Sequence, residues 1–225
     1  MIIISGASRG IGQFLLHKFI GEGTPVIGLY NNTVPSNPEH TYKVDITNHA
    51  SIAAFIAETD GLLSELTLLN CAGANYNAFA HKADPSKWAE LININLVGTF
   101  NMINALLPIM REQNFGRIIN FSSIVAQVGI AGTSAYAASK AGLWGMSKAI
   151  AVENASKGIT INNLNLGYFN IGMITDVPPA IQETIKDKIP NKKFGDPDEI
   201  FRIIKFLNVS AYTTGTSIDI NGGLY

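Results

Sequence analysis

Short apolar runs alternate along the chain with longer segments whose apolar residues recur every three or four positions. The runs are rich in Ile, Val and Leu and predict strands buried on both faces, at 2–4, 25–30, 42–46, 66–69, 117–121, 159–164 and 218–223. Helical spacing predicts long helices between them at 84–113 and 134–157, and a short helix at 178–188. Because strands and helices alternate, we expect one doubly wound, Rossmann-like α/β domain over 1–225. Its parallel sheet should have about seven strands, with helices on both faces.

One connection departs from this alternation. Residues 31–40 follow the second predicted strand and contain Pro35 and Pro38 without any helical period. Proline lacks a backbone N–H and pushes the preceding residue out of the α region. We therefore expect a loop where a helix would otherwise stand.

Composition and charge exclude several classes of protein. A net charge of −1 without a basic cluster gives no electrostatic case for a nucleic-acid or anionic-membrane partner. The four histidines are scattered without metal-ligand spacing. No uninterrupted apolar run approaches the roughly 18 residues that span a bilayer. No basic segment precedes the first apolar residues, so we expect no secretory signal there. The single cysteine, Cys71, suits a reducing compartment, so we expect a cytoplasmic protein without a metal site.

The strongest candidate for chemistry is a tyrosine–lysine pair. Tyr136 and Lys140 are four residues apart in a predicted helix and therefore share one face. A fixed ammonium favours phenolate, so we expect it to lower the Tyr136 pKa from about 10 and permit proton exchange. Ser123 stands thirteen residues earlier and could offer its hydroxyl to the same substrate oxygen. Taken alone, the pair also fits a surface tyrosine over a lysine that extends to water.

Together, Ser123, Tyr136 and Lys140 resemble the Ser…Tyr-x-x-x-Lys signature of the short-chain dehydrogenase/reductase family, spacing included. The resemblance implies an oxidoreductase that interconverts a carbonyl and a secondary alcohol. It implies that Tyr136 exchanges the proton, Ser123 orients the carbonyl oxygen, and Lys140 tunes Tyr136 and holds the nicotinamide ribose. Asn95 matches the position that supports a proton-relay water. The alternative for Asn95 is a core asparagine that bonds only to structure.

A glycine-rich turn follows the first predicted strand and precedes a helical pattern. Its sequence, SGASRGIG, has the G-x-x-x-G-x-G spacing of the family's glycine motif. Glycines let backbone N–H groups approach a pyrophosphate, and a helix N-terminus favours negative charge. The resemblance implies cofactor contacts from Gly6, Ser8, Arg9, Gly10, Ile11 and Gly12.

The second predicted strand bears on the choice between NAD and NADP. Enzymes that prefer NAD often place a carboxylate at its end for the ribose 2′-hydroxyl. Here Asn31 follows the strand as an implied cofactor contact, and no carboxylate appears before Glu39. Arg9 could meet a 2′-phosphate instead. We therefore favour NADP(H), with NAD(H) still possible.

Further segments resemble the family in order along the chain. D-I-T at 45–47 resembles the motif beside the adenine, although it also fits the start of a helix. N-C-A-G at 70–73 resembles the family's Asn-Asn-Ala-Gly. After the sixth strand the family usually has Pro-Gly and then a threonine, but this chain has Leu166-Gly167 and Ile171. The cofactor contacts implied in these segments are Asp45, Ile46, Asn70, Ala72, Gly73, Gly167 and Phe169, besides Tyr136 and Lys140.

The segment 189–200 and the Asn-Gly-Gly ending most resemble 3-oxoacyl-[acyl-carrier-protein] reductases. The resemblance implies a small-molecule or acyl-carrier-bound carbonyl substrate. A carrier protein would favour basic residues near the site entrance, for which the candidates are Arg111, Arg117, Lys192 and Lys193. The alternatives are a reductase of sugars or small ketones, and a non-catalytic dinucleotide-binding sensor or scaffold. Broad apolar faces at 84–113 and 134–157 predict a homodimer or homotetramer.

Overall fold

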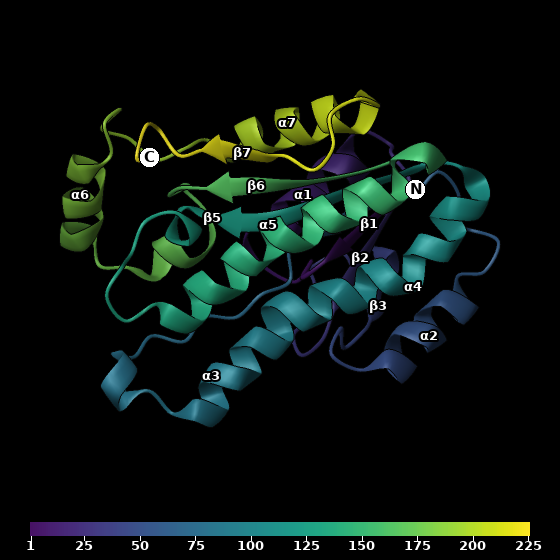
Figure 1. The fold of residues 1–225 in the computed structure, drawn as a ribbon. Helices are drawn as coiled ribbons and strands as arrows, with labels where there is room; N and C mark the ends of the chain where they lie inside the picture. The colour runs from purple at the N-terminus through teal and green to yellow at the C-terminus, as the bar shows by residue number, and fades with distance from the viewer.

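A computed structural model describes residues 1–225, except for the side chains of Met173 and Asp176. Seven parallel strands form one sheet in the order β3-β2-β1-β4-β5-β6-β7 (Figure 1). The strands are β1 (Ile2–Ser5), β2 (Val26–Tyr30), β3 (Thr41–Lys43), β4 (Thr67–Asn70), β5 (Gly116–Ser123), β6 (Ile159–Leu166) and β7 (Ser217–Ile220). The predicted parallel α/β sheet is confirmed.

The strand order reverses at β1. This strand pairs with β2 on one side and with β4 on the other, and Ser5 lies in register with Asn70. In doubly wound sheets, ligands bind beyond the carboxyl ends of the strands at such a reversal. The reversal therefore puts the glycine-rich turn after β1 beside the N-C-A-G segment after β4.

Helices cover both faces of the sheet. On one face lie α2 (His49–Glu58), α4 (Gly98–Gln113) and α5 (Ser134–Asn154), and on the other lie α1 (Gly10–Gly21) and α7 (Pro197–Val209) (Figure 1). Because side chains alternate along a strand, neighbouring residues enter different cores. The structure therefore has two apolar layers separated by the sheet.

The first strand shows this division. Ile3 packs into the core under α4 and α5, whereas Ile2 and Ile4 pack into the core under α1 and α7. Another helix, α6 (Pro179–Lys188), lies beyond the carboxyl ends of β5 and β6 (Figure 1). That end of the sheet also carries the candidate catalytic residues.

The long helix predicted at 84–113 is continuous but not uniform. It consists of α3 (Pro85–Ile92), a π-helical turn at Asn93–Val97, and α4. Its predicted start is confirmed, since the Asp84 carboxylate accepts hydrogen bonds from the N–H groups of Ser86 and Lys87. The spacing of apolar residues did not predict the π-helical turn.

The same stretch, Pro85–Gln113, is long and apolar enough to cross a membrane by length and composition alone. We did not predict this from the sequence, because polar residues interrupt the apolar residues of this stretch. Several of its apolar side chains are fully buried against the sheet: Met102, Ile103, Leu106 and Met110. We therefore interpret it as a core helix.

The expected loop at 31–40 is confirmed. It contains only a 3₁₀ turn at Pro38–His40. Pro35 is buried, and the Ser36 hydroxyl lies within hydrogen-bond distance of Gln13 and His17 on α1. The loop is thus attached to α1, while β3 forms an edge of the sheet.

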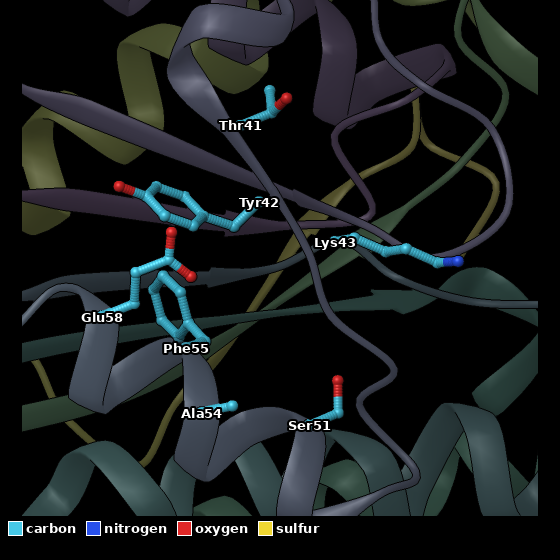
Figure 2. Close-up of a pocket in the computed structure, with 7 residues that line it drawn as sticks. All are labelled: Thr41, Tyr42, Lys43, Ser51, Ala54, Phe55 and Glu58. Atoms are coloured by element: carbon cyan, nitrogen blue, oxygen red, sulfur yellow. The ribbon is translucent and has the colours of Figure 1, made fainter.

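A cavity of about 350 Å³ opens between β3 and α2, lined by Thr41, Tyr42, Lys43, Ser51, Ala54, Phe55 and Glu58. Figure 2 shows Glu58 beside the rings of Tyr42 and Phe55, whereas Lys43 points away from them. The two rings meet edge to face with centroids 5.5 Å apart. This cavity belongs to the sheet edge, whereas the candidate catalytic residues lie on β5 and α5.

Candidate active site

The structure brings Ser123, Tyr136 and Lys140 together at the carboxyl end of β5. This strand ends at Ser123, and α5 begins at Ser134 after a turn in which Gly132 has φ +85°. The Ser123 side chain lies close enough to the Tyr136 phenol to oppose the burial-induced rise of the Tyr136 pKa. The Lys140 Nζ lies 5.6 Å from the centre of the Tyr136 ring. The three residues expected to act together therefore form one cluster.

Lys140 is buried with only 5% of its surface exposed. Its Nζ donates a 2.6 Å hydrogen bond to the backbone carbonyl oxygen of Phe121. Burial lowers the pKa of Lys140 to about 8, because an ammonium loses its hydration there. Burial raises the pKa of Cys71, so its thiol stays neutral and is no nucleophile.

The prediction that the Tyr136 pKa is lowered is wrong for this structure. Burial raises the Tyr136 pKa because it removes water from the phenolate, and the hydrogen bond with Ser123 opposes the rise. The Lys140 Nζ donates its 2.6 Å hydrogen bond to the Phe121 carbonyl. Tyr136 is therefore a protonated phenol at neutral pH, the form that can donate a proton.

Asn95 lies in the π-helical turn and is completely buried. Its Oδ1 accepts from the N–H of Ala74 at 2.8 Å, and its Nδ2 donates to the Ala74 carbonyl and the Ser139 hydroxyl. A Cβ built on Gly73 would lie 3.4 Å from Asn95 Oδ1 and 3.8 Å from Lys140 Nζ. These bonds fit the structural alternative for Asn95, and its part in proton relay stays a prediction.

The glycine-rich turn forms a tight backbone cradle. Helix α1 begins at Gly10, and its N-cap residue, Arg9, makes no side-chain cap, so the first N–H groups of the helix remain available. A Cβ on Gly6 would lie 2.6 Å from Cα of Ala72, and a Cβ on Gly12 would lie 2.3 Å from the Gly6 carbonyl oxygen. Only glycine fits these positions, and the free N–H groups suit the phosphates of a dinucleotide.

The other residues predicted near this cradle occupy accessible positions. The Arg9 and Asn31 side chains are exposed, while Ser8 and Ile11 are partly buried. The position of Arg9 at the helix N-terminus leaves its guanidinium free to meet an anion. These placements agree with a cofactor cradle without testing each contact.

Asp45 and Ile46 accept hydrogen bonds that stabilise the connection between β3 and α2. The Asp45 carboxylate accepts hydrogen bonds from the N–H and hydroxyl of Thr47, and Asn48 caps α2. The Ile46 carbonyl accepts from Asn101 at 3.0 Å. The structural interpretation of this motif is therefore confirmed, and an adenine contact stays a prediction.

Asn70 joins β4 to β5. Its Nδ2 donates to Asn120 Oδ1 at 2.8 Å, and its own Oδ1 is buried without a hydrogen-bond partner among the described residues. The Ala72 N–H donates to the Ser5 hydroxyl at 3.3 Å. A polar atom of this kind beside the strand reversal is consistent with a polar ligand there.

The segment after β6 folds back on two neighbours. Gly167 packs against Asn221 so closely that a Cβ would lie 2.7 Å from Asn221 Cα. The Phe169 ring is buried against Gly195, and the Phe169 carbonyl accepts a hydrogen bond from the Ile171 N–H at 2.7 Å. The cofactor contact implied for Phe169 stays a prediction. Further along, Gly172 approaches the glycine-rich turn, within 3.4 Å of a Cβ built on Gly10.

The basic residues proposed for a carrier protein do not gather at the site. Arg117 is the second residue of β5, at the opposite end of the strand from Ser123, and it is buried. Its guanidinium donates to the carbonyls of Gly116 and Gly158. Arg111 lies in the last turn of α4 and bonds Asn154 at 2.5 Å. The expectation is wrong for both, because parallel strands put their amino and carboxyl ends on opposite sides.

The structure also adds residues that sequence reasoning missed. Ser139 accepts the Asn95 amide. Ser122 donates to the Lys140 carbonyl and accepts from the indole N–H of Trp144. Trp144 stands four residues after Lys140, so the helical period that paired Tyr136 with Lys140 could have found it.

The cluster at β5 and α5, with the glycine cradle at the strand reversal, defines a class: a dinucleotide-binding α/β oxidoreductase. Residues 1–182 match the family model described as short chain dehydrogenase. The chain is 37% identical over 234 residues to an acetoacetyl-CoA reductase of Shinella zoogloeoides, covering 99% of this chain and 97% of that protein. It is 33% identical over 239 residues to a 3-oxoacyl-[acyl-carrier-protein] reductase of Pseudomonas aeruginosa, covering 99% and 96%.

A solved structure of a candidate gluconate dehydrogenase from Agrobacterium tumefaciens has a TM-score of 0.90 at 24% identity. The match covers 100% of this chain and 95% of that one. This likeness supports the fold alone. The chain belongs to the short-chain dehydrogenase/reductase family, and it is a dehydrogenase/reductase acting on CH–OH or C=O groups. Membership implies a nicotinamide dinucleotide cofactor.

Proposed function

We propose that this protein reduces the 3-oxo group of a 3-oxoacyl thioester to the hydroxyl, with NADPH as the reductant. The cluster of Ser123, Tyr136 and Lys140, with Lys140 Nζ 5.6 Å from the centre of the Tyr136 ring, carries the proposal for carbonyl chemistry. The thioester class is supported by the names of relatives, which are reductases of acetoacetyl-CoA and of 3-oxoacyl-[acyl-carrier-protein].

Each residue has one part in the proposed reaction. When bound, NADPH would supply the hydride that the carbonyl carbon receives. The Ser123 hydroxyl donates a hydrogen bond to the carbonyl oxygen, and the Tyr136 phenol transfers its proton to that oxygen as negative charge develops. Lys140 stabilises the phenolate left behind and holds the ribose, and Asn95 supports the return of a proton from solvent. The alcohol thus receives one hydride and one proton.

The proposed cofactor site combines the α1 N-terminus with the neighbouring turns. The free N–H groups after Arg9 would hold the pyrophosphate, and the exposed Arg9 guanidinium would pair with the 2′-phosphate of NADPH. Asn70, Ala72 and Gly73 would border the cofactor at the strand reversal. No three His, Cys, Asp or Glu side chains gather into a metal-binding group in the part of the chain that the structure describes.

The free thioester of coenzyme A is the form of substrate we favour. Lys193 lines a pocket with Phe169 and Gly195, and Lys192 Nζ donates to the Asp187 carbonyl. Arg111 and Arg117 lie away from the carboxyl end of β5, where a carrier protein would have to approach. We propose that residues 1–225 act as one catalytic domain. We further propose that the protein works in the cytoplasm and forms a homodimer or homotetramer.

The test is a steady-state assay of the purified protein with acetoacetyl-CoA, following NADPH oxidation. We expect turnover that falls by about 10²-fold or more in Tyr136→Phe, since general acid catalysis contributes that much. Tyr42→Phe, at the far edge of the sheet, serves as the matched control and should keep wild-type activity.

Three results would change the assignment. Turnover of sugars or small ketones, but not of acetoacetyl-CoA, would replace the substrate class. Activity that survives intact in Tyr136→Phe would remove its proton-donor role. Tight NADPH binding with no turnover of any carbonyl compound would favour the sensor or scaffold alternative, for which Tyr136→Phe should leave binding unchanged.

A further inference from the structure

A third residue extends the face of α5 that carries Tyr136 and Lys140. Trp144 is spaced from Lys140 as Lys140 is from Tyr136, so the three side chains leave the helix in one line. The Trp144 indole N–H lies 3.1 Å from the Ser122 hydroxyl oxygen and 2.9 Å from Asn165 Oδ1. Each member of the line thus contacts the carboxyl ends of the central strands.

The Ser122 hydroxyl links Trp144 to the backbone of Lys140. It donates to the Lys140 carbonyl oxygen at 3.1 Å, so its own oxygen is left to accept from Trp144. Ser122 also immediately precedes Ser123 at the end of β5. A shift of Ser122 therefore moves both the catalytic serine and the backbone of the catalytic lysine.

The orientation of Asn165 depends on Asp219 in β7. Asn165 lies in register with Ser122 on one side and with Asp219 on the other. Its Nδ2 donates to Asp219 Oδ1 at 2.8 Å. A carboxylate can only accept, so this bond turns the Asn165 amide nitrogen toward Asp219 and leaves its carbonyl oxygen for Trp144.

Asp219 also holds the loop that follows Ser123. Its Oδ1 accepts a second hydrogen bond, at 2.9 Å, from the Gln127 side-chain nitrogen. Gln127 comes directly after the 3₁₀ turn Ile124–Ala126, which begins at Ser123. One carboxylate oxygen at the sheet edge therefore connects the loop after the catalytic serine with the Asn165–Trp144 contact.

We propose that Trp144 and Asp219 are positioning residues for the reaction. They fix the rotation of α5 against β5 and thereby hold Tyr136 within hydrogen-bond reach of Ser123. This inference rests on the proposed carbonyl reduction, and it assigns a catalytic consequence to a hydrogen-bond chain that begins on the last strand of the sheet. Neither residue needs to touch the substrate.

The experiment compares Trp144→Phe, Asp219→Ala and Asp219→Asn in the acetoacetyl-CoA assay. We expect kcat to fall about 10-fold or more in the first two, with the KM for NADPH within about threefold, because small misplacements of reacting groups are costly. Asp219→Asn keeps an acceptor oxygen and should recover most of the rate. The Asp219 side chain is exposed, so its variants should fold even if Trp144→Phe does not.

A pH profile separates positioning from plain stability. Loss of the Ser123 contact removes the effect that opposes the burial-induced rise of the Tyr136 pKa, so the alkaline limb of kcat should move to higher pH. None of these variants replaces Lys140 or Cys71, the titratable neighbours of the cluster. Ser147→Ala is the control, because Ser147 is buried on the same helix and bonds Asn163 instead. Ser147→Ala should lower the stability of the protein without moving the alkaline limb of kcat.

Two outcomes would overturn the proposal. One is an unchanged kcat and alkaline limb in both Trp144→Phe and Asp219→Ala. The other is an effect in Asp219→Asn as large as in Asp219→Ala. If the wild type reduces no carbonyl compound, the proposed function fails by itself, and the positioning role is then decided by tyrosinate absorbance. The Tyr136 titration, measured against Tyr136→Phe, should move to higher pH in Trp144→Phe, and an unmoved titration would overturn the role.

Discussion

The ammonium of Lys140 donates a 2.6 Å hydrogen bond to the backbone carbonyl of Phe121, two residues before Ser123. A buried lysine gains one strong acceptor here but loses most of its hydration. The lowered pKa of about 8 records this imbalance. The site therefore holds a charge that folding itself does not favour.

This imbalance predicts an unusual dependence of stability on pH. The folded pKa of Lys140 lies below its unfolded value, so between the two values the unfolded chain binds more protons and stability rises with pH. We expect the free energy of unfolding to rise by roughly 0.7 kcal/mol between about pH 7 and about pH 8.5. Urea denaturation under reducing conditions would measure it.

Substitution isolates the contribution of Lys140. Lys140→Met should be more stable than the wild type near neutral pH and should lose the rise over this interval. Lys148→Met, which replaces an exposed lysine on the same helix, should keep the rise. Equal slopes in all three proteins would contradict the explanation. Above this interval, the raised pKa values of Cys71 and Tyr136 act in the opposite direction.

The glycine cradle predicts a sharp contrast between two substitutions in α1. Gly12→Ala would place a methyl group 2.3 Å from the Gly6 carbonyl, so the turn must move. We expect a loss of about 1–3 kcal/mol in stability and weaker NADPH binding, read by thermal unfolding and nicotinamide fluorescence. Gly21→Ala meets nothing within 4 Å and should be neutral or stabilising. Similar behaviour of the two variants would refute the cradle.

Arg9 predicts the cofactor preference. The exposed guanidinium at the start of α1 should bind the 2′-phosphate, so Arg9→Ala should weaken NADPH about 10-fold or more while NADH changes little. Fluorescence titration with both cofactors measures this, and Arg9→Lys should retain part of the preference. Tighter binding of NADH by the wild type would be evidence against NADP(H).

Exposed apolar side chains on the helical face predict self-association. Phe100 on α4 is 45% exposed and Val152 on α5 is 84% exposed. We expect light scattering to give the mass of a dimer or tetramer, reduced by Phe100→Asp. Val34→Asp, in the loop at the sheet edge, is the control and should not change the mass. A monomeric wild type would refute the prediction.

Much of the fold could be predicted because local chemistry and tertiary structure agree. Apolar runs identified all seven strands, and the prolines at 35 and 38 identified the missing helix. The helical period brought Tyr136 and Lys140 together, and the end of a strand brought Ser123 to them. These inferences use only spacing along the chain.

The remainder depended on burial and on partners distant in sequence. The Tyr136 pKa was misjudged because a neighbouring charge can be named from sequence, whereas the cost of desolvation cannot. Arg117 was placed at the wrong end because its distance from the site depends on which end of β5 it occupies. The contact between Asn165 and Asp219 requires the register of β6 on β7.

The π-helical turn at Asn93–Val97 determines how this helix would respond to the deletion of one residue. A turn of this kind holds one residue more than an α-helical turn, so deleting a single residue there would yield an uninterrupted α-helix. The wider turn absorbs the extra residue, so the deletion would leave α3 and α4 in nearly the same angular phase. Re-winding the turn as α-helix with all of its residues would instead rotate α3 by about 100° relative to α4. Trp88, which now donates to the Ser134 hydroxyl at the start of α5, would then face away from it. The π-helical turn thus keeps the two halves of this helix in phase despite the additional residue.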